Sequence, residues 1–178
     1  MINIKQELEV AKKASEIAAA LLINNKDNIN KILSNEGRDV KLKADLESEK
    51  VIKDYLLANS NFPILAEESG ANQDLGNSFW VVDPLDGTSN YSRDFPMCCI
   101  SIALIHENEI TLGVINDFNR GSLYEGSIDS KAKLNGADIF VSSIDDKSKA
   151  TLATGLPAKG NFNKESMSEL SNELVSWK

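Results

Sequence analysis

The segment from Trp80 to Asn90, WVVDPLDGTSN, contains the residues best suited to chemistry. Two carboxylates, Asp83 and Asp86, end an apolar run and are followed by Gly87 and Thr88. Carboxylate oxygens are the ligands that Mg²⁺ prefers, and a Gly-Thr turn exposes backbone N–H groups that can hold an anion. This pattern predicts a site for a divalent cation and a phosphate group.

A third carboxylate is expected at the same place. Pro63 to Ala66 is a short apolar run followed by Glu67, and Phe79 to Val82 is another followed by Asp83. If these two strands are neighbours that run in the same direction, both acids emerge at one edge of the sheet, where open α/β sheets commonly place their sites. We expect these two side chains to meet that of Asp86 around a shared cation.

Phosphate monoesters resist hydrolysis because the nucleophile must approach an anion, and two or more cations placed close together relieve that problem. The carbonyl of Leu85, between the two aspartates, can supply a fourth oxygen ligand, and Pro84 restricts the backbone beside it. Carboxylates this close repel one another without metal. The pKa of at least one should therefore be raised, and metal binding should weaken at acid pH.

Each of these motifs also has an ordinary structural interpretation. Asp-Pro and Asp-Gly are common turn dipeptides, so the segment around Asp83 can be a plain surface loop. Glu67-Glu68-Ser69 can be a solvated loop, and Asp45 can be no more than the N-terminal cap of a helix.

Two amphipathic helices should precede the strands. Apolar residues recur at spacings of three and four along the first, at Ile4, Leu8, Ala11, Ala14, Ile17, Ala18, Leu21 and Leu22. A polar stretch from Asn24 to Asn35 follows. A second helix, capped by Asp45 at its N-terminus, is indicated by Leu46, Ile52, Tyr55 and Leu56.

Short apolar runs continue after the central motif. Cys98 to Ile105 and Ile110 to Ile115 predict a β-hairpin whose turn holds His106, the only histidine. We expect that histidine to be solvated, which excludes histidine-based catalysis. Alternation along a strand should point Cys98 and Cys99 to opposite faces, as two packing thiols without a disulfide or a zinc site.

The last third of the chain carries weaker signals. Asn119-Arg120-Gly121 and Asn135-Gly136 indicate turns, the second a hairpin. Ala150 to Thr154 indicates one more strand, and Met167, Leu170 and Leu174 indicate a final amphipathic helix that continues to Lys178.

Composition limits the classes of function. The chain has 178 residues, 42% of them hydrophobic, which is enough for a sizeable core. Its formal net charge of −8 disfavours nucleic acid and anionic membranes as partners. The sequence shows no signal peptide and no apolar run approaching the roughly 18 residues of a membrane span, so a cytoplasmic location is expected.

Taken together, Glu67-Glu68-Ser69 and the run from Asp83 to Asn90, DPLDGTSN, preceded by Asp45, closely resemble the inositol monophosphatase family of Mg²⁺-dependent, lithium-sensitive phosphatases. Gly113-Val114-Ile115 and Leu134-Asn135-Gly136 resemble that family's downstream hairpins. The resemblance implies an α/β fold of the sugar-phosphatase type, an α-β-α-β-α sandwich, and suggests a homodimer.

The resemblance also implies roles for individual residues. Glu67, Asp83 and the Leu85 carbonyl would bind a first Mg²⁺, Asp83 and Asp86 would share a second, and Glu67 can touch a third. Asp45 and Thr88 would be catalytic, orienting and deprotonating a metal-activated water that attacks phosphorus in line. The substrate phosphate would lie against Asp86 and the backbone N–H groups of Gly87 and Thr88.

The chain departs from the family pattern in length. Members usually run roughly eighty residues further and carry a Trp-Asp motif that completes the second metal site, and Ser34 or Asn35 lies near where many have a lysine. We therefore expect residues 1–142 to form an N-terminal lobe with the metal site, and residues 143–178 to begin a second lobe that is incomplete at the C-terminus.

Three functions are compatible with these patterns. The first is a metal-dependent phosphomonoesterase acting on a small polyol, sugar or nucleotide phosphate. The second is a haloacid dehalogenase type phosphatase that forms an aspartyl-phosphate, although its aspartates are separated by one residue and not by two. The third is a non-catalytic metal-binding or interaction module.

Overall fold

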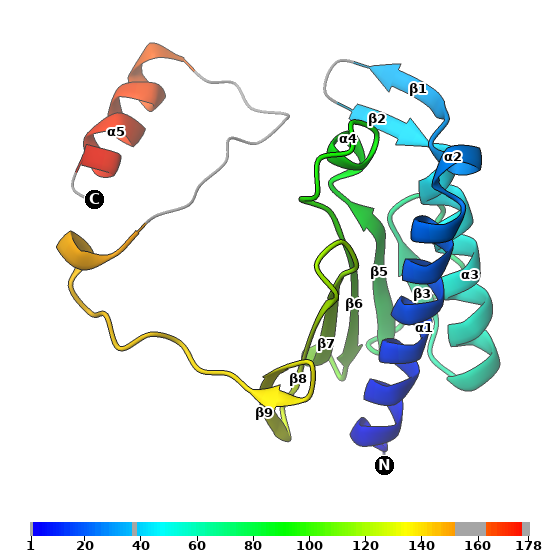
Figure 1. Ribbon diagram of the computed structural model, residues 1–178. Coiled ribbons are helices and arrows are strands. Elements are labelled where there is room, and N and C mark those ends of the chain that lie inside the picture. Colours follow the sequence, from blue (N-terminus) through cyan, green and yellow to red (C-terminus); the bar gives the residue numbers. More distant parts are fainter. Residues whose placement is uncertain (1, 37–38, 152–162, 176–178) are drawn as a thin grey trace. The chain divides into compact units, whose positions relative to one another are not determined.

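The computed structural model describes residues 2–36, 39–151 and 163–175, and those residues fall into two compact units, divided between Ile139 and Phe140. The first unit holds almost all of the regular structure, in which helices cover one face of a large mixed β-sheet (Figure 1). Its helices are α1 (Ile4–Asn24), α2 (Lys26–Ile29), α3 (Lys43–Asn59) and α4 (Thr88–Tyr91). The expected lobe boundary after residue 142 stays a prediction.

Eight strands form the sheet, in the order β10-β9-β8-β7-β6-β5-β3-β4. Neighbouring strands are antiparallel except for β3 and β5, which run parallel with Ala66 opposite Val82. The strands are β3 (Ile64–Ala66), β4 (Gly70–Ala71), β5 (Phe79–Asp86), β6 (Cys99–His106), β7 (Glu109–Asp117), β8 (Ser122–Ser127), β9 (Ser130–Leu134) and β10 (Ala137–Asp138). The two apolar runs are thus parallel neighbours, which is the condition under which both acids were expected at one edge of the sheet.

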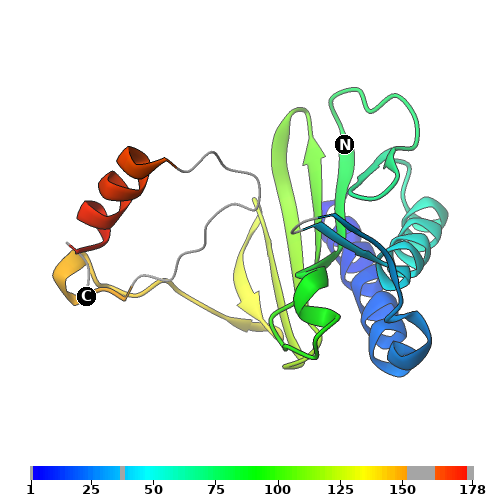
Figure 2. The same cartoon turned by 90° about the horizontal axis from the view of Figure 1, so that it is seen from above.

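The core lies between this sheet and the two long helices. Helices α1 and α3 lie side by side on one face of the sheet, as the view from above shows (Figure 2). Alanines at 11, 14 and 18 are fully buried on α1, and these small side chains allow close approach to α3 and the sheet. Trp80 and Val82 of β5 are buried in the same core, and β5 packs against α3, so β5 is fixed through its apolar side chains.

The first helix begins and ends near the predicted residues. The Asn3 side chain accepts a hydrogen bond from the Gln6 backbone N–H, which satisfies one of the free donors at the start of α1. The stretch after it was expected to be merely polar, but it contains α2 and a small antiparallel hairpin of β1 (Ile32–Glu36) and β2 (Asp39–Leu42).

The second unit is described only in part. A short 3₁₀ helix spans Lys147–Lys149, and α5 spans Lys164–Val175, as the apolar spacing predicted. Asn163 caps α5 by accepting a hydrogen bond from the Ser166 N–H. Most of the strand expected from Ala150 to Thr154 lies outside the described residues. No helix in the described part of the chain is long and apolar enough to span a membrane.

Asp45 caps the N-terminus of α3 as expected, although from the first turn and not from the N-cap position: its carboxylate accepts a hydrogen bond from the Leu42 N–H. The expectations for His106 were wrong in detail. His106 is the last residue of β6 and not part of the turn. It is only partly exposed because it packs edge-on against Phe62, and its Nδ1 lies 3.0 Å from Ser78 Oγ.

Candidate metal-dependent active site

The central motif occupies the end of β5, where the strand contains an irregularity. Asp83 lies opposite Ser101 on β6, but Asp86 lies opposite Cys99, so β5 carries one residue more than its partner over this interval. This is a β-bulge. In a regular strand, residues three positions apart, as Asp83 and Asp86 are on β5, point to opposite faces of the sheet. Their partners on β6, Ser101 and Cys99, are two positions apart and point to the same face. The bulge therefore brings Asp83 and Asp86 to the same side of the sheet.

Glu67 and Asp83 are brought together as the parallel pairing of their strands predicted. Their side chains share a hydrogen bond, which two carboxyl groups can form only by holding a proton between them. Partial burial, and next the charge of Asp83, raise the pKa of Glu67 to about 7, although the residue as a whole is exposed to solvent. Burial also raises the pKa of Asp83. The expected raised pKa is confirmed for this pair.

Asp86 is exposed and stands apart from that pair. Its charge contributes to the raised pKa of Glu67, and its Oδ2 lies 3.9 Å from the thiol of Cys99. In the described part of the chain, no three His, Cys, Asp or Glu side chains are arranged so that they could already hold a metal ion. The structure thus assembles two of the three expected carboxylates, and Asp86 as a further ligand stays a prediction.

The chemistry of the donor atoms fits a hard divalent cation. Two adjacent ionised carboxyl groups repel each other. They relieve this repulsion either by sharing a proton or by binding a cation in place of the proton. The Leu85 N–H donates to Asp83 Oδ1 over 3.1 Å, which orients that carboxylate. Leu85 is buried, and its carbonyl oxygen lies 3.0 Å from Thr88 Oγ1.

Asp45 and Thr88 are joined across the helix and strand layers. The Thr88 hydroxyl donates to Asp45 Oδ1 over 2.8 Å, while Asp45 Oδ2 accepts the Leu42 N–H over 2.7 Å. Asp45 is only 2% exposed, and this burial, opposed by the hydrogen bond from Thr88, raises its pKa to about 6. A carboxylate with a pKa near neutrality is suited to accept a proton at physiological pH.

Gly87 lies where the chain turns from β5 into α4. Its φ of +85° belongs to the left-handed region, and a Cβ built on it would lie 2.6 Å from the Met97 carbonyl oxygen. Only glycine therefore fits at this position without displacing backbone. Tyr91, at the end of α4, is buried, and its hydroxyl donates to the Leu22 carbonyl on α1 over 2.7 Å. The turn from β5 into α4 is thus fixed by the Met97 backbone beside Gly87 and by the hydrogen bond from Tyr91 to Leu22.

Two site-supporting residues were missed in the sequence. Ser48 donates from its hydroxyl to the Pro84 carbonyl over 2.8 Å, and the Glu49 carboxylate accepts the N–H groups of Glu68 and Ser69. Both are buried on α3 and lie three and four residues after Asp45. One face of α3 therefore holds both loops of the site. The available signal was a polar set at helical spacing, Asp45, Ser48 and Glu49, on a face expected to be buried.

The sequence is similar to a known family of proteins. The model of the inositol monophosphatase family matches residues 3–175. The chain belongs to the inositol monophosphatase family. A protein named Nus factor SuhB from Xylella fastidiosa is 37% identical over 156 residues, covering 85% of this chain and 56% of the relative. Inositol-1-monophosphatase from Synechocystis is 34% identical and covers 86% of this chain and 54% of the relative.

The fold agrees with solved structures of the family. The inositol monophosphatase from Anabaena (Nostoc) is similar with a TM-score of 0.70 and 30% identity, over 83% of this chain and 54% of that one. The mixed α/β fold expected of the family is thereby confirmed. The chain spans just over half the length of these relatives.

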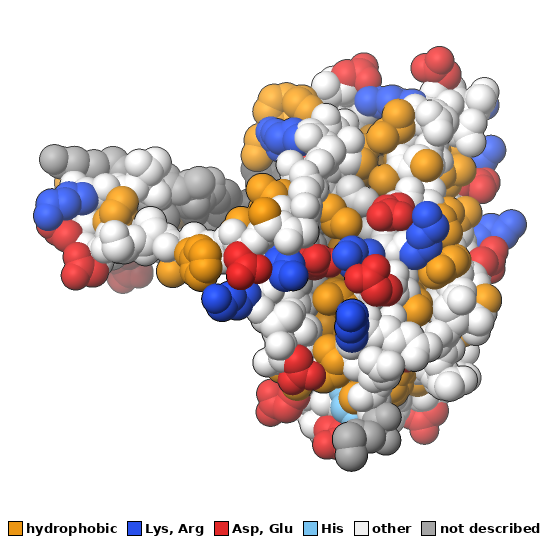
Figure 3. Space-filling view, turned by 60° about the horizontal axis from the view of Figure 1, so that its bottom comes forward, with side chains coloured by type: hydrophobic (Ala, Val, Ile, Leu, Met, Phe, Trp, Pro, Cys, Tyr) orange, Lys and Arg blue, Asp and Glu red, His pale blue; other side chains and the backbone are white. Residues whose placement is uncertain are grey.

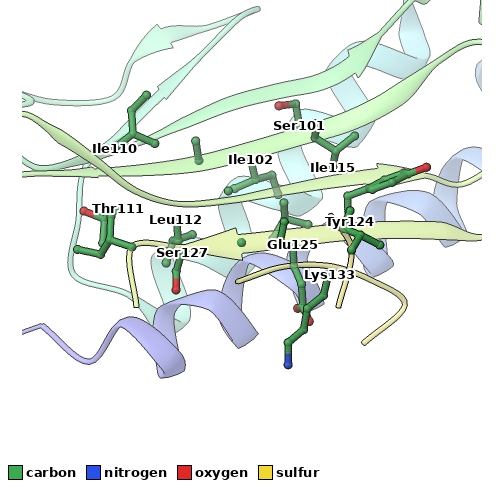
Figure 4. A pocket seen from close by; sticks show the side chains of 17 residues that line it. Ser101, Ile102, Ile110, Thr111, Leu112, Ile115, Tyr124, Glu125, Ser127 and Lys133 are labelled. Atoms are coloured by element: carbon green, nitrogen blue, oxygen red, sulfur yellow. The ribbon is translucent and has the colours of Figure 1, made fainter. Parts of the chain in front are cut away.

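The surface also has a mainly apolar hollow and a face of mixed charge. A hollow of about 490 Å³ lies on the sheet and is lined mainly by aliphatic side chains of β6, β7 and β8, including Ile110 and Ile115 (Figure 4). Glu125, which also lines it, forms an ion pair with Lys12 of α1. On the face shown in Figure 3, basic side chains lie among acidic ones and do not gather into one patch.

Proposed function

We propose that this chain carries the metal-binding and nucleophile-orienting part of a Mg²⁺-dependent phosphomonoesterase. Its substrates would be small polyol, sugar or nucleotide phosphates. The observation that carries this proposal is the juxtaposition of two pairs, Glu67 with Asp83 and Asp45 with Thr88, around the Asp83–Thr88 turn. Names of relatives, such as inositol-1-monophosphatase, support the same reaction class.

The proposed cation ligands are Glu67, Asp83, the Leu85 carbonyl and Asp86. Two or three Mg²⁺ ions bound there would supply positive charge against the phosphoryl oxygens and lower the pKa of a bound water. Glu67 and Asp83 must release their shared proton before they can act as ligands. The bulge at Pro84 and Leu85 supports this assignment, because it places Asp83 and Asp86 on one side of the sheet.

The proposed catalytic pair is Asp45 and Thr88. Asp45, with a pKa of about 6, is mostly ionised at pH 7 and can accept the Thr88 hydroxyl proton over the existing 2.8 Å hydrogen bond. Thr88 can in turn accept a proton from the attacking water, so that the pair orients and deprotonates the nucleophile. The substrate phosphate is proposed to lie at Asp86 and the backbone N–H groups of Gly87 and Thr88.

Direct attack by water is favoured over an aspartyl-phosphate intermediate. Asp83 accepts a hydrogen bond from the Leu85 N–H and shares a proton with Glu67, which makes it a poor nucleophile. Membership of the inositol monophosphatase family supports the same choice. The homodimer suggested by family resemblance stays a prediction.

A release assay for inorganic phosphate tests the proposal. The chain should hydrolyse inositol 1-phosphate or 4-nitrophenyl phosphate with Mg²⁺, and lithium should suppress the reaction. Excess EDTA should abolish it, as should Asp86→Asn, while Asp54→Asn, on exposed helix surface, serves as the matched control. Robust turnover in EDTA would refute a metal-dependent mechanism.

A second candidate is a non-catalytic metal-binding or interaction module. One observation favours it: in the described residues, no three carboxylates are already clustered so that they could hold a metal ion. Calorimetry with MgCl₂ separates the two candidates. Mg²⁺ binding without hydrolysis of any phosphate ester supports the module, and turnover by the 178-residue chain removes it.

A further inference from the structure

Glu67, the proposed metal ligand that follows β3, begins a short loop of polar residues. Glu67 and Ser69 are exposed, and Glu68 between them is partly exposed. The Glu67 N–H continues the parallel pairing of β3 with β5, because it donates to the Val82 carbonyl over 3.1 Å. The next two N–H groups, of Glu68 and Ser69, bond to a side chain of α3 instead. The loop therefore depends on α3 for its position.

The α3 side chain that accepts these two N–H groups is the carboxylate of Glu49. Its Oε2 lies 2.9 Å from the Glu68 nitrogen and 3.3 Å from the Ser69 nitrogen. Hydrogen bonds to an ionised carboxylate are stronger than those between neutral groups, and burial strengthens them further. Glu49 is only 4% exposed. The loop is thus attached to α3 through a buried charge.

Lys53, one turn further along α3, fixes the orientation of this carboxylate. Its Nζ lies 3.6 Å from the other Glu49 oxygen, Oε1, and donates to the Ser69 hydroxyl over 2.6 Å. The cation compensates the Glu49 carboxylate for the water that it loses on burial. Because the two oxygens of Glu49 have different partners, Oε2 is directed at the loop and Oε1 at the lysine.

Glu49 also relates the metal ligand to the residue proposed to orient the nucleophile. Asp45 lies four residues before Glu49, so both are on one face of α3, about one helical turn apart. Asp45 accepts the Thr88 hydroxyl, while Glu49 holds the loop that begins at Glu67. A single turn of helix therefore sets the spacing between the two pairs of the candidate site.

We propose that Glu49 is a positioning residue for the metal site, which holds the Glu67 loop so that the Glu67 carboxylate stands beside Asp83 before a cation binds. Glu49 is not itself a ligand in this assignment, because its oxygens are directed at the loop and at Lys53. The inference rests on the proposed function, because it takes Glu67 as a ligand of Mg²⁺. Side chains that hold a metal ligand in place commonly contribute about 10- to 100-fold to metal affinity.

Titration calorimetry of the intact chain with MgCl₂ tests this role. Glu49→Ala should weaken Mg²⁺ binding about tenfold, equivalent to about 1.4 kcal/mol, because the loop must then be ordered when the cation binds. Glu49→Gln should stay within about threefold of the unsubstituted chain, because one amide oxygen can still accept both N–H groups. Equal weakening by the two substitutions would assign the effect to the lost charge and overturn the positioning role.

The Mg²⁺ dependence of turnover gives a second measure. In Glu49→Ala, the Mg²⁺ concentration for half-maximal phosphate release should rise about tenfold, while kcat at saturating Mg²⁺ should change little. This separation is expected because Glu49 acts through Glu67 and does not touch the reacting atoms. A fall in kcat with an unchanged Mg²⁺ requirement would contradict the assignment.

Glu125→Ala is the matched control. The Glu125 side chain is 9% exposed, against 6% for Glu49, and it also pairs with a lysine, Lys12. It lies on β8, which β6 and β7 separate from β5. Its substitution removes the same charge and a comparable buried ion pair, but should leave the affinity for Mg²⁺ unchanged. Equal weakening of Mg²⁺ binding in Glu125→Ala and Glu49→Ala would show a general loss of stability or charge and overturn the inference.

Amide hydrogen exchange in EDTA examines the loop without any cation. The N–H groups of Glu68 and Ser69 should exchange about tenfold faster in Glu49→Ala than in the unsubstituted chain, and Glu49→Gln should retain their protection. Exchange that Glu49→Ala leaves unchanged would overturn the positioning role even if phosphate esters are hydrolysed.

Failure of the proposed function gives a different result. If Mg²⁺ binding and amide exchange follow the expected pattern but no phosphate ester is hydrolysed, the esterase is removed and the positioning role of Glu49 stands. If the unsubstituted chain binds no Mg²⁺, both are overturned.

Discussion

The Thr88 hydroxyl lies 2.8 Å from the buried carboxylate of Asp45, although the two residues belong to different layers of the fold and are 43 positions apart. Asp45 belongs to α3 and Thr88 begins α4 at the end of β5. This hydrogen bond therefore depends on how α3 packs against the sheet. It also gives the most direct test of the catalytic assignment.

Substitutions in this pair should lower turnover without unfolding the chain. Asp45→Asn retains an acceptor for the Leu42 N–H but cannot take a proton, so kcat for phosphate release should fall by about 10²-fold or more. Thr88→Val, which keeps the side-chain shape, should have a comparable effect. KM should change much less, and circular dichroism should show an intact fold.

The matched control for the threonine is Thr111→Val. Thr111 is buried in β7, and its hydroxyl donates to the Glu109 carbonyl at the far end of the sheet from Asp86. It should leave kcat unchanged. If Thr88→Val retained wild-type kcat, the hydroxyl would have no part in orienting the nucleophile.

The metal-free protein should lose stability as the pH rises. The pKa of Asp45 is raised from 3.8 to about 6, so the folded state binds more protons than the unfolded state across that interval. The free energy of unfolding must then decrease with rising pH, on the order of 2 kcal/mol for this group by pH 7. The raised pKa of Glu67 also makes the free energy of unfolding decrease as the pH rises, up to about pH 7.

Thermal unfolding in EDTA at pH 5 and pH 7.5 checks this dependence. The difference in Tm between the two pH values should shrink in Asp45→Asn, because that variant no longer carries a titrating group at this position. A Tm difference identical to that of the unsubstituted chain would mean that the buried carboxylate does not titrate between these pH values.

Magnesium binding should depend on pH in the opposite direction. Because the shared proton of Glu67 and Asp83 must leave, and the pKa of Glu67 is about 7, the affinity for Mg²⁺ should fall by about tenfold for each pH unit below neutrality. Titration calorimetry in buffers of different ionisation enthalpy measures the released proton directly. Glu67→Gln should weaken binding and remove most of this proton release.

Glu107→Gln provides the control for that measurement. Glu107 is an exposed glutamate in the β6–β7 turn, at the opposite end of β6 from Cys99, the strand partner of Asp86. Its substitution changes the net charge by the same amount. If both variants weakened Mg²⁺ binding equally, the effect would reflect the overall charge and not ligation by Glu67.

Several parts of the site could be predicted from the sequence because they depend on local patterns. The apolar runs before Glu67 and Asp83 predicted two strands. Their parallel pairing, the condition under which both acids reach one sheet edge, is present in the structure. The Asp83-Pro84-Leu85-Asp86-Gly87-Thr88 motif predicted a cation and phosphate site from donor chemistry alone. These inferences needed only neighbours in the chain.

The parts that could not be predicted depend on partners distant in the chain. The bulge between Asp83 and Asp86 appears only when β6 is paired with β5, because it is a mismatch between two strands. Ser48 and Glu49 bind backbone atoms of Pro84 and Glu68, whose carbonyl and N–H carry no sequence signal. His106 was misplaced for the same reason, since its partner Ser78 is 28 residues away.

Gly87 provides a structural prediction that is independent of any metal. Gly87→Ala must place a methyl group 2.6 Å from the Met97 carbonyl oxygen while holding an unfavourable φ of +85°. The left-handed backbone alone costs roughly 1–2 kcal/mol, and displacement of the Met97 backbone adds to it. Gly76→Ala shares the positive φ, at +56°, but its Cβ would meet nothing within 4 Å.

Chemical denaturation should therefore show a clearly larger loss of unfolding free energy for Gly87→Ala than for Gly76→Ala. Equal losses would mean that the contact with Met97 relaxes at no cost, and that the turn into α4 is not held in the shape on which the phosphate position depends.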